Sequence, residues 1–190
     1  VQEYNDLLTE NQVFIERTAD VGVLDRDLAI NYGVTGPILR GSGVPMDVRR
    51  AEPYSGYEKY AFNIPVGRGL KGTIGDCWDR YYVRIEEMLE SLKIVRQAMD
   101  GLPVGDILSK QLKKSIKPPP GEAYVRIENP RGELGFYVIS DGKDKPTRVK
   151  VRAPSFCNLS VLPELARDVL LADLVAILGS IDIVLGEVDR

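Results

Sequence analysis

The sequence predicts an α+β fold that is mainly α-helical: a helix bundle with a long central helix and a small antiparallel three-stranded sheet. Residues 76–99 carry apolar side chains at steps of three and four, which is the pattern of a packed helix. Residues 122–152 contain three short alternating runs separated by turn residues, which predicts a meander of strands. The composition, 44% hydrophobic and 28% charged over 190 residues, is typical of one folded globular domain.

Helices are expected through most of residues 1–109, which form the bundle part of the chain. Residues 1–17 predict one amphipathic helix. The residues expected on its inner face are Tyr4, Leu7, Leu8, Asn11 and Phe14. Asp25–Tyr32 predicts a shorter helix that Gly33 ends, and Pro37 suits the first turn of another.

Glycine and proline interrupt residues 41–69 too often for a long helix, so this stretch is predicted to be a loop. Its aromatic side chains are expected to pack on one another. They are Tyr54, Tyr57, Tyr60 and Phe62.

The clearest predicted helix covers residues 76–99 and is about 36 Å long at the usual helical rise. Its apolar seam consists of Trp78, Tyr81, Ile85, Met88, Leu92, Val95 and Met99. Tyr82 and Leu89 widen the stripe, which favours a bundle of several helices over a two-stranded coil. The remaining predicted helices are too few to cover this seam, so we expect partner helices from outside the chain.

A basic, proline-rich connector, residues 110–121, is expected to follow the long helix. The antiparallel meander occupies residues 122–152. Its strands are predicted at Ala123–Glu128, Leu134–Ile139 and Arg148–Arg152. Residues 153–190 are predicted to hold one helix, Leu162–Ile181, and a C-terminal tail.

Missing residue types exclude several chemistries. Without histidine there is no Ser-His-Asp triad, no Cys-His pair and no imidazole base. Cys77 and Cys157 lie 80 positions apart and neither forms a C-x-x-C pair, so we expect reduced thiols and no metal ligands. No run approaches the roughly 20 apolar residues that a membrane helix needs. The polar, acidic first residues predict no signal peptide.

Charge is uneven along the chain, whose net charge is −3. Residues 110–152 carry 11 basic and 5 acidic side chains, a net of +6. We interpret this segment as a solvated linker beside a hairpin. Nucleic acid, anionic lipid or an acidic partner remain alternatives, because each would meet a basic surface.

Three sequence blocks stand out. The first is Gly36–Arg49, followed by Pro53-Tyr54. The second is Gly75–Tyr81, with Arg84 and Glu86–Met88. The third comprises Arg152–Phe156, Gly179–Val184 and the ending Gly186–Arg190. In this order the blocks resemble the D-type subunits of the bacterial NADH:quinone oxidoreductase, respiratory complex I, in the C-terminal part of a longer family chain.

That family is related to the large subunit of nickel–iron hydrogenases, which binds its metals through two C-x-x-C pairs. In this chain the positions of the second pair fall at Val184 and Glu187. The resemblance therefore implies no metal or iron–sulfur ligands here, and a former metal cavity reused for quinone as substrate. The pocket wall is expected from Asp182, Val184, Glu187 and Arg190. A tail that only docks and seals an interface is the alternative from the residues alone.

The resemblance also implies a role in a larger enzyme. Electrons would pass from NADH through iron–sulfur clusters to quinone, at the interface with the neighbouring cluster-bearing subunit, coupled to proton translocation. The family's head-group ligands, a histidine and a tyrosine, belong to its N-terminal part. We therefore expect no catalytic residue in this fragment and no activity from the fragment alone. The expected location is peripheral, on the cytoplasmic face of the bacterial inner membrane, among the other complex I subunits.

Two alternative functions remain open from the sequence. One is a non-catalytic scaffold subunit of a related hydrogenase-like membrane complex, and the other is a nucleic-acid-binding module on residues 110–152. Four charged residues of the second block are expected to form helix-surface pairs: Asp79, Arg80, Arg84 and Glu86. Three charged residues of the glycine- and proline-rich loop are expected to fix loop backbone or bind a partner subunit: Asp47, Arg49 and Arg50.

Overall fold

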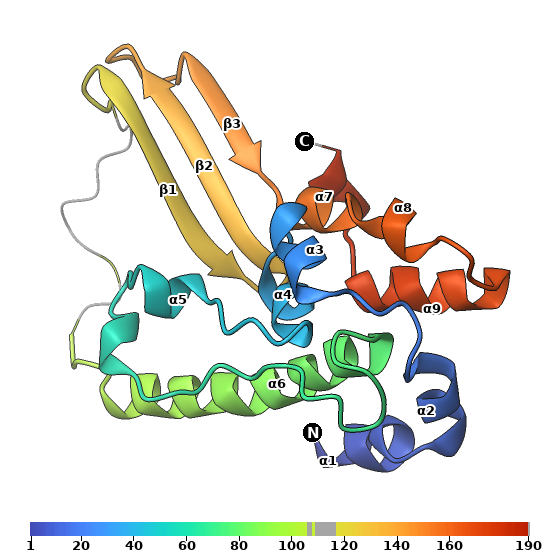
Figure 1. Cartoon of the computed structure of the whole chain (residues 1–190). Coiled ribbons are helices and arrows are strands. Elements are labelled where there is room, and N and C mark those ends of the chain that lie inside the picture. The colour runs from blue at the N-terminus through green and yellow to red at the C-terminus, as the bar shows by residue number, and fades with distance from the viewer. Residues whose placement is uncertain (106–107, 109–116, 190) are drawn as a thin grey trace.

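The computed structural model describes residues 1–105, 108 and 117–189. It is mainly helical with one three-stranded antiparallel sheet, which confirms the predicted α+β class (Figure 1). The helical elements are α1 (Gln2–Tyr4), η1 (Asn5–Thr9), α2 (Gln12–Thr18), α3 (Arg26–Asn31), α4 (Gly36–Gly41), α5 (Val48–Ala51), η2 (Tyr57–Lys59), α6 (Cys77–Asp100), α7 (Pro154–Leu159), α8 (Leu162–Leu165), α9 (Leu171–Ile181) and α10 (Leu185–Val188). The strands are β1 (Gly121–Asn129), β2 (Gly132–Ser140) and β3 (Arg148–Arg152).

The short helix α4 lies at the centre of the molecule, between α6, the lower end of the sheet and the C-terminal helices (Figure 1). All six of its residues are buried. Its apolar side chains Ile38 and Leu39 join Leu24, Val161 and Ile177 in the main core. The core therefore binds segments from both ends of the chain to one central turn of helix.

The long helix α6 begins at Asp76, whose carboxylate accepts a hydrogen bond from the amide of Asp79 at 2.7 Å. The predicted seam is buried in the first half of the helix, where Trp78 and Ile85 are covered. In the second half the same seam is open, and exposure reaches 70% at Met99. Among the described residues, the far half of α6 is therefore only partly covered.

The sheet has strand order β1-β2-β3 and projects away from the helices (Figure 1). All three strands contain the predicted runs, and β1 and β2 are longer than predicted. The register pairs Val125 with Phe136 and Phe136 with Val151, so these side chains share one face. The turn between β1 and β2 brings Arg131 back to the helical part of the fold, which is where the sheet contributes to the site.

The single helix predicted over residues 1–17 is wrong, because the chain breaks between η1 and α2. Asn11 was expected on the inner face, but it caps α2: its Oδ1 accepts hydrogen bonds from the amides of Val13 and Phe14 at 3.0 and 3.2 Å. An asparagine cap stabilises a new helix by about 1 kcal/mol, so the side chain competes with continuation of the earlier one.

The single helix predicted over Leu162–Ile181 is also wrong, because α8 ends at Leu165 and α9 begins at Leu171. Between them Asp168 adopts φ +56°, a left-handed conformation through which a right-handed helix cannot continue. Two further helices, α7 and α10, were not predicted. Pro154 opens α7 at a position where its missing N–H costs nothing.

The loop predicted over residues 41–69 contains only the short helices α5 and η2. Its tyrosines pack on one another as predicted, with ring centroids 5.1 Å apart for Tyr54 and Tyr57. Arg50 lies over the ring of Phe62 at 3.9 Å and donates to the carbonyl oxygen of Phe62 at 2.7 Å. The predicted role of this loop arginine in fixing backbone is confirmed.

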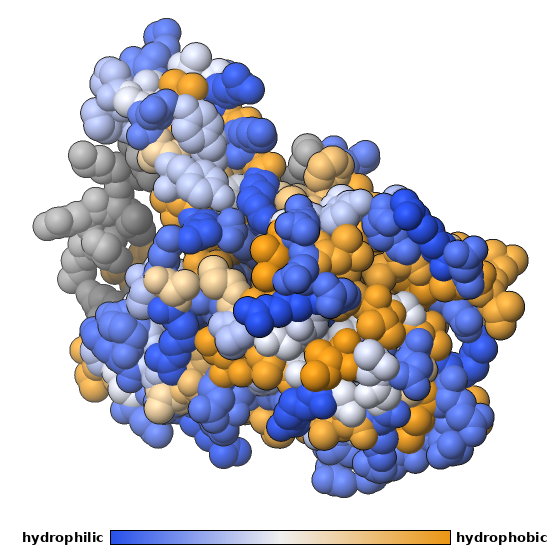
Figure 2. Space-filling view, in the orientation of Figure 1, coloured by the Kyte–Doolittle hydropathy of each residue, from blue (hydrophilic) through white to orange (hydrophobic). Residues whose placement is uncertain are grey.

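Most of the predicted connector 110–121, and Arg190, lie outside the described residues. Within the described ranges, no helix combines the length and the apolar content needed to cross a bilayer. Figure 2 shows exposed hydrophobic side chains gathered over α9, at the right of the view. Those with the largest exposure on this helix and its start are Leu170, Leu171 and Val175.

Candidate functional site

Asp182 lies directly after α9, where the chain turns toward the tail. Its φ and ψ are 55° and 53°, and its amide donates to the carbonyl oxygen of Gly179 at 3.2 Å. Aspartate tolerates this left-handed conformation better than most residues, because its short side chain can bond locally. The turn ends α9 and leaves the Asp182 carboxylate between α6 and the β1–β2 turn.

Two guanidinium groups approach Asp182 from different elements. Arg131 donates from Nε to the Asp182 carbonyl oxygen at 2.8 Å and from Nη2 to its carboxylate at 3.2 Å. Arg84 of α6 places Nε 4.0 Å from the other carboxylate oxygen. The Asp182 side chain remains 44% exposed, so it can still meet a ligand.

Two cavities share Arg84 and Asp182 as wall residues. The first, called here the Phe14 cavity, has a volume of about 560 Å³ and is mostly apolar. It is lined by Phe14, Arg17, Thr18, Cys77, Tyr81, Arg84, Ala176, Gly179, Ser180 and Asp182. The second, called the Glu87 cavity, has a volume of about 670 Å³. It is lined by Val1, Arg40, Arg49, Tyr57, Arg84, Glu87, Met88, Ser91, Leu92, Val95, Glu128, Asn129, Pro130 and Asp182.

Arg84 has an unused hydrogen-bond donor at this junction. Its Nη1 donates to the carbonyl oxygen of Arg80 at 2.8 Å, whereas its buried Nε has no partner among the described residues. Burial lowers the pKa of Arg84 to about 10, so the group stays charged at neutral pH. The Arg84 side chain is 22% exposed and lines both cavities, so its guanidinium can donate to a carbonyl oxygen of a ligand.

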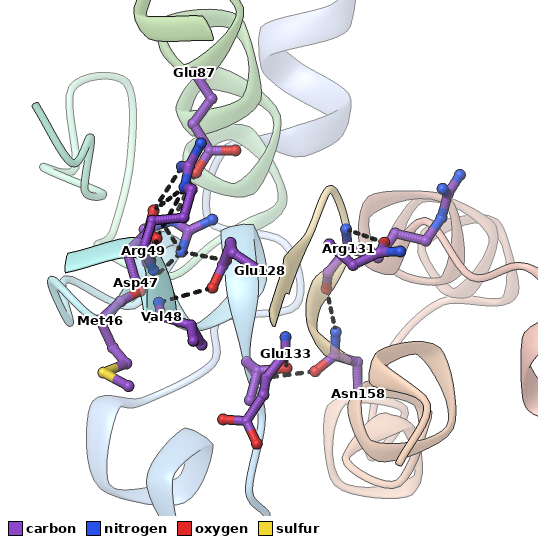
Figure 3. A network of polar contacts seen from close by, with 12 residues as sticks. Met46, Asp47, Val48, Arg49, Glu87, Glu128, Arg131, Glu133 and Asn158 are labelled. Carbon is purple, nitrogen blue, oxygen red and sulfur yellow. Dashed lines mark hydrogen bonds and ion pairs between the residues drawn. The ribbon is translucent and has the colours of Figure 1, made fainter. Parts of the chain in front are cut away.

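A cluster of five charged side chains lies beside the Glu87 cavity, and all of them except Asp47 line it (Figure 3). The members of this Arg40 cluster are Arg40, Asp47, Arg49, Glu87 and Glu128. Arg40 is buried and donates to Glu87 at 2.6 Å, to Glu128 at 2.8 Å and to the carbonyl oxygen of Met46 at 2.8 Å. Asp47 binds Arg49 at 2.6 Å and also caps α5. The cluster joins α4, α5, α6 and β1.

The carboxyl groups of this cluster differ in proton affinity. Burial raises the pKa of Glu87 above its usual 4.5, although the charge of Arg40 opposes the shift. Burial alone would also raise the pKa of Asp47, but the hydrogen bonds and charge of Arg49 outweigh it and lower that pKa below 3.8. Three carboxylates likewise outweigh burial at Arg40 and raise its pKa. Glu87 is therefore the more readily protonated of these two acids.

The four residues predicted to form the pocket wall do not share one location. Asp182 lines both cavities. Val184 and Glu187 line neither of them and contact α7 instead: the amide of Val184 donates to Ser155 Oγ at 3.3 Å, and the Glu187 carboxylate accepts from the Ser155 amide at 3.1 Å and from its hydroxyl. Arg190 lies outside the described residues.

The helix-surface pairs predicted for the second sequence block are wrong. Asp79 and Arg80 are buried. Arg80 donates to the carbonyl oxygens of Gly75 at 2.5 Å and Gly22 at 2.9 Å, and to Ser180 Oγ at 2.9 Å. Gly22 and Ser180 lie in other parts of the chain, so helical spacing could not identify them.

The remaining members of that block do not pair with one another. Glu86 pairs with Arg68 of the loop. Arg84 was predicted to be a surface residue of the helix, but it lines both the Phe14 cavity and the Glu87 cavity. Among the described residues no group of three or more metal-ligating side chains lies close together.

Comparisons with known proteins agree with these sequence blocks. The family described as "Respiratory-chain NADH dehydrogenase, 49 Kd subunit" matches residues 1–118 and 108–190. A similar relative is the second D-type subunit of the NADH-quinone oxidoreductase of Solibacter usitatus, 54% identical over 190 residues, which are all of this chain and 50% of the relative. The first D-type subunit of the Roseiflexus enzyme is 51% identical over 99% of this chain and 51% of its own length.

The D-type subunit of the NADH-quinone oxidoreductase of Chlorobaculum tepidum is 52% identical over all of this chain and 48% of its own length. The chain therefore spans about half the length of these relatives. The two family matches together reach from the first residue to the last. On this evidence the chain belongs to the family of the 49 kDa subunit of respiratory-chain NADH dehydrogenase.

Proposed function

We propose that this chain is the C-terminal portion of the complex I subunit that forms the quinone-reduction site. Its relatives are named as D-type subunits of NADH-quinone oxidoreductase, and the chain matches about half of each. In the whole protein, electrons from NADH reach quinone from an iron–sulfur cluster on a neighbouring subunit, and the reaction drives proton translocation. The subunit lies at the cytoplasmic face of the inner membrane, in contact with other complex I subunits.

One observation carries the proposal: Asp182 and Arg84 lie together at the junction of two cavities. The Phe14 cavity can accept an apolar ring or chain, since ligand sites are mostly apolar with a few placed polar groups. The Arg84 guanidinium can donate to a quinone oxygen, and Asp182 can orient a donor supplied by the other half of the subunit. Glu187 anchors the tail on Ser155, and the amide of Val184 donates to the hydroxyl of the same serine.

The test replaces Asp182 in the full-length subunit within the assembled complex. Asp182→Asn keeps the shape and the left-handed backbone but removes the negative charge. We expect a severalfold higher KM for quinone. Asp168→Asn is the matched control, because Asp168 has a similar left-handed φ of 56° yet is exposed and lines neither cavity. An unchanged KM and inhibitor sensitivity in Asp182→Asn would exclude Asp182 from the quinone site.

The tail itself is tested by Val184→Met, which adds bulk at a half-exposed position beside the site. We expect altered quinone affinity or inhibitor sensitivity, with NADH oxidation by an artificial electron acceptor unchanged. If both quinone parameters stay at wild-type values, the tail docks only and does not form the pocket wall.

A further inference from the structure

The Arg40 cluster contains one carboxyl group that is bound differently from the other two. Asp47 accepts hydrogen bonds from Arg49 at both of its oxygens. Glu128 likewise uses both oxygens, accepting from Arg40 at 2.8 Å and from the amide of Val48 at 3.0 Å. Both groups therefore accept a hydrogen bond at each of their two carboxylate oxygens.

Glu87 is bound at one oxygen only. Its Oε1 accepts from Arg40 Nε at 2.6 Å, and its Oε2 has no donor among the described residues. Glu87 lines the Glu87 cavity, so the free oxygen can exchange a proton with whatever occupies that space. Figure 3 shows Glu87 reaching from α6 toward the guanidinium groups of the cluster.

The charges around Glu87 come from four elements. Arg40 of α4 and Arg49 of α5 favour its carboxylate form, whereas Glu128 of β1 opposes it. Arg84 lies three residues earlier on α6 and lines the same cavity. Burial of the group is the largest influence and favours the neutral acid. The pKa of Glu87 therefore lies above its usual 4.5, because burial favours the neutral acid more than the two arginines favour the anion, and Arg40 remains in place to bind the anion when the proton departs.

We propose that Glu87 is a proton-donating residue of the quinone site. The inference rests on the proposed function. Reduction of a quinone to the hydroquinone takes two electrons, from the iron–sulfur donor of the neighbouring subunit, and two protons. Glu87 supplies one of these protons, its carboxyl O–H bond breaking as an O–H bond forms on the reduced quinone oxygen, and solvent supplies the other. The carboxylate that remains is bound by Arg40, and it regains a proton from water before the next turnover.

The test uses the assembled complex with full-length subunit variants. Glu87→Gln keeps a carbonyl oxygen for Arg40 Nε but cannot donate a carboxyl proton. We expect kcat for quinone reduction to fall at least tenfold, because positioned general acids contribute about 10²-fold or more. KM for quinone should stay within about twofold, since a proton donor acts mainly on the chemical step. Glu86→Gln is the matched control: it is the adjacent residue on α6 and pairs with Arg68 of the loop instead.

The pH profile separates proton donation from a purely structural role. A donor must be protonated, so wild-type kcat should fall as pH rises through the pKa of Glu87. This alkaline limb should disappear in Glu87→Gln and return, at a lower rate, in Glu87→Asp. If Glu87→Gln has the kcat of the wild type and the same fall in kcat at alkaline pH, the inference is overturned.

A measurement on the wild type covers the case in which the variants fail to assemble. Redox-induced infrared difference spectra should show loss of a protonated carboxyl band when bound quinone is reduced. Absence of that band change would overturn the inference. If Asp182→Asn and Val184→Met raise KM while Glu87→Gln behaves as wild type, only this inference fails. If none of the three alters quinone kinetics, the proposed function itself fails.

Discussion

The side chain of Arg131 binds both the main chain and the side chain of Asp182. Its Nε donates to the Asp182 carbonyl oxygen at 2.8 Å, and its Nη2 donates to the Asp182 carboxylate at 3.2 Å. This contact joins the turn of the sheet to the end of α9. The carbonyl oxygen of Arg131 in turn accepts from Asn158 of α7 at 3.0 Å. Three elements that are distant in sequence are thereby fixed around the carboxylate that both cavities share.

Loss of the Arg131 side chain should loosen this junction. We expect Arg131→Ala to lower the free energy of unfolding by about 1 kcal/mol, because both partners are partly exposed and solvent weakens the pair. Urea unfolding of the chain measures the change. Arg148→Ala, on the exposed strand β3, is the control and should be neutral. Equal stability of the two variants would show that the junction does not depend on Arg131.

The buried Arg80 should matter far more than an exposed arginine on the same side of the fold. Arg80→Met leaves the carbonyl oxygen of Gly22 without the Arg80 donor and removes one of the two donors to the carbonyl oxygen of Gly75, so we expect a loss of about 3 kcal/mol. Arg68→Met breaks only a surface pair with Glu86 and should cost less than about 1 kcal/mol, as is usual for such pairs. A similar midpoint of unfolding for both variants would contradict the structural role of Arg80.

Two glycines should respond in opposite directions to the same added methyl group. A Cβ at Gly67 would lie 1.8 Å from the carbonyl oxygen of Gly41, so Gly67→Ala must displace backbone. We expect a loss of at least about 2 kcal/mol. A Cβ at Gly179, within α9, meets nothing within 4 Å, so Gly179→Ala should stabilise the helix by about 0.5–1 kcal/mol. Thermal denaturation distinguishes the two, and a stable Gly67→Ala variant would refute the close approach.

Asp47 should stabilise the fold only where it is ionised. Its folded-state pKa lies below the ordinary value of 3.8, so its contribution is fully present above pH 3.8 and is lost as pH falls through the folded pKa. Asp47→Asn retains the cap on α5 but not the charge, and we expect it to cost about 2 kcal/mol at neutral pH. The deficit relative to wild type should shrink under acid conditions. A deficit that is constant from neutral pH down to the folded pKa would show that the charge is irrelevant.

Glu87 should show the opposite pH dependence. Because its pKa is raised in the folded state, the folded protein binds the proton more tightly, and stability falls as pH rises from 4.5 through the folded pKa. Glu87→Gln should therefore gain stability relative to wild type over that interval. Unfolding midpoints of both proteins across the interval measure the effect, and parallel curves would argue against the raised pKa.

The parts of the fold that were predicted are those with a local pattern. The seam of α6 follows from its steps of three and four, and the strands follow from alternation and turn residues. The break after Leu165 carries no glycine or proline, so Asp168 could not be recognised as the end of a helix. Asn11 fitted the helical face equally well as an inner residue or as a cap, and only the observed hydrogen bonds decide between them.

The candidate site was predictable in part, for a similar reason. Asp182 came from its position in a family motif, not from any physical signal. Arg131 lies 51 residues away from Asp182, and Glu87 lies 47 residues away from Arg40. Such pairs form only when the sheet and the helices pack. Local patterns in a single sequence therefore do not reveal which distant charges will meet.

The exposed apolar seam in the second half of α6 should affect how the polypeptide behaves before it binds its partners. Leu92, Val95 and Met99 form an apolar stripe, and each of these side chains is about half exposed or more. Exposed apolar surfaces of this kind bind chaperones and promote aggregation and proteolytic degradation. When this chain is overproduced by itself, part of it should therefore aggregate or be degraded, and the soluble fraction should rise with the supply of a partner that covers the stripe.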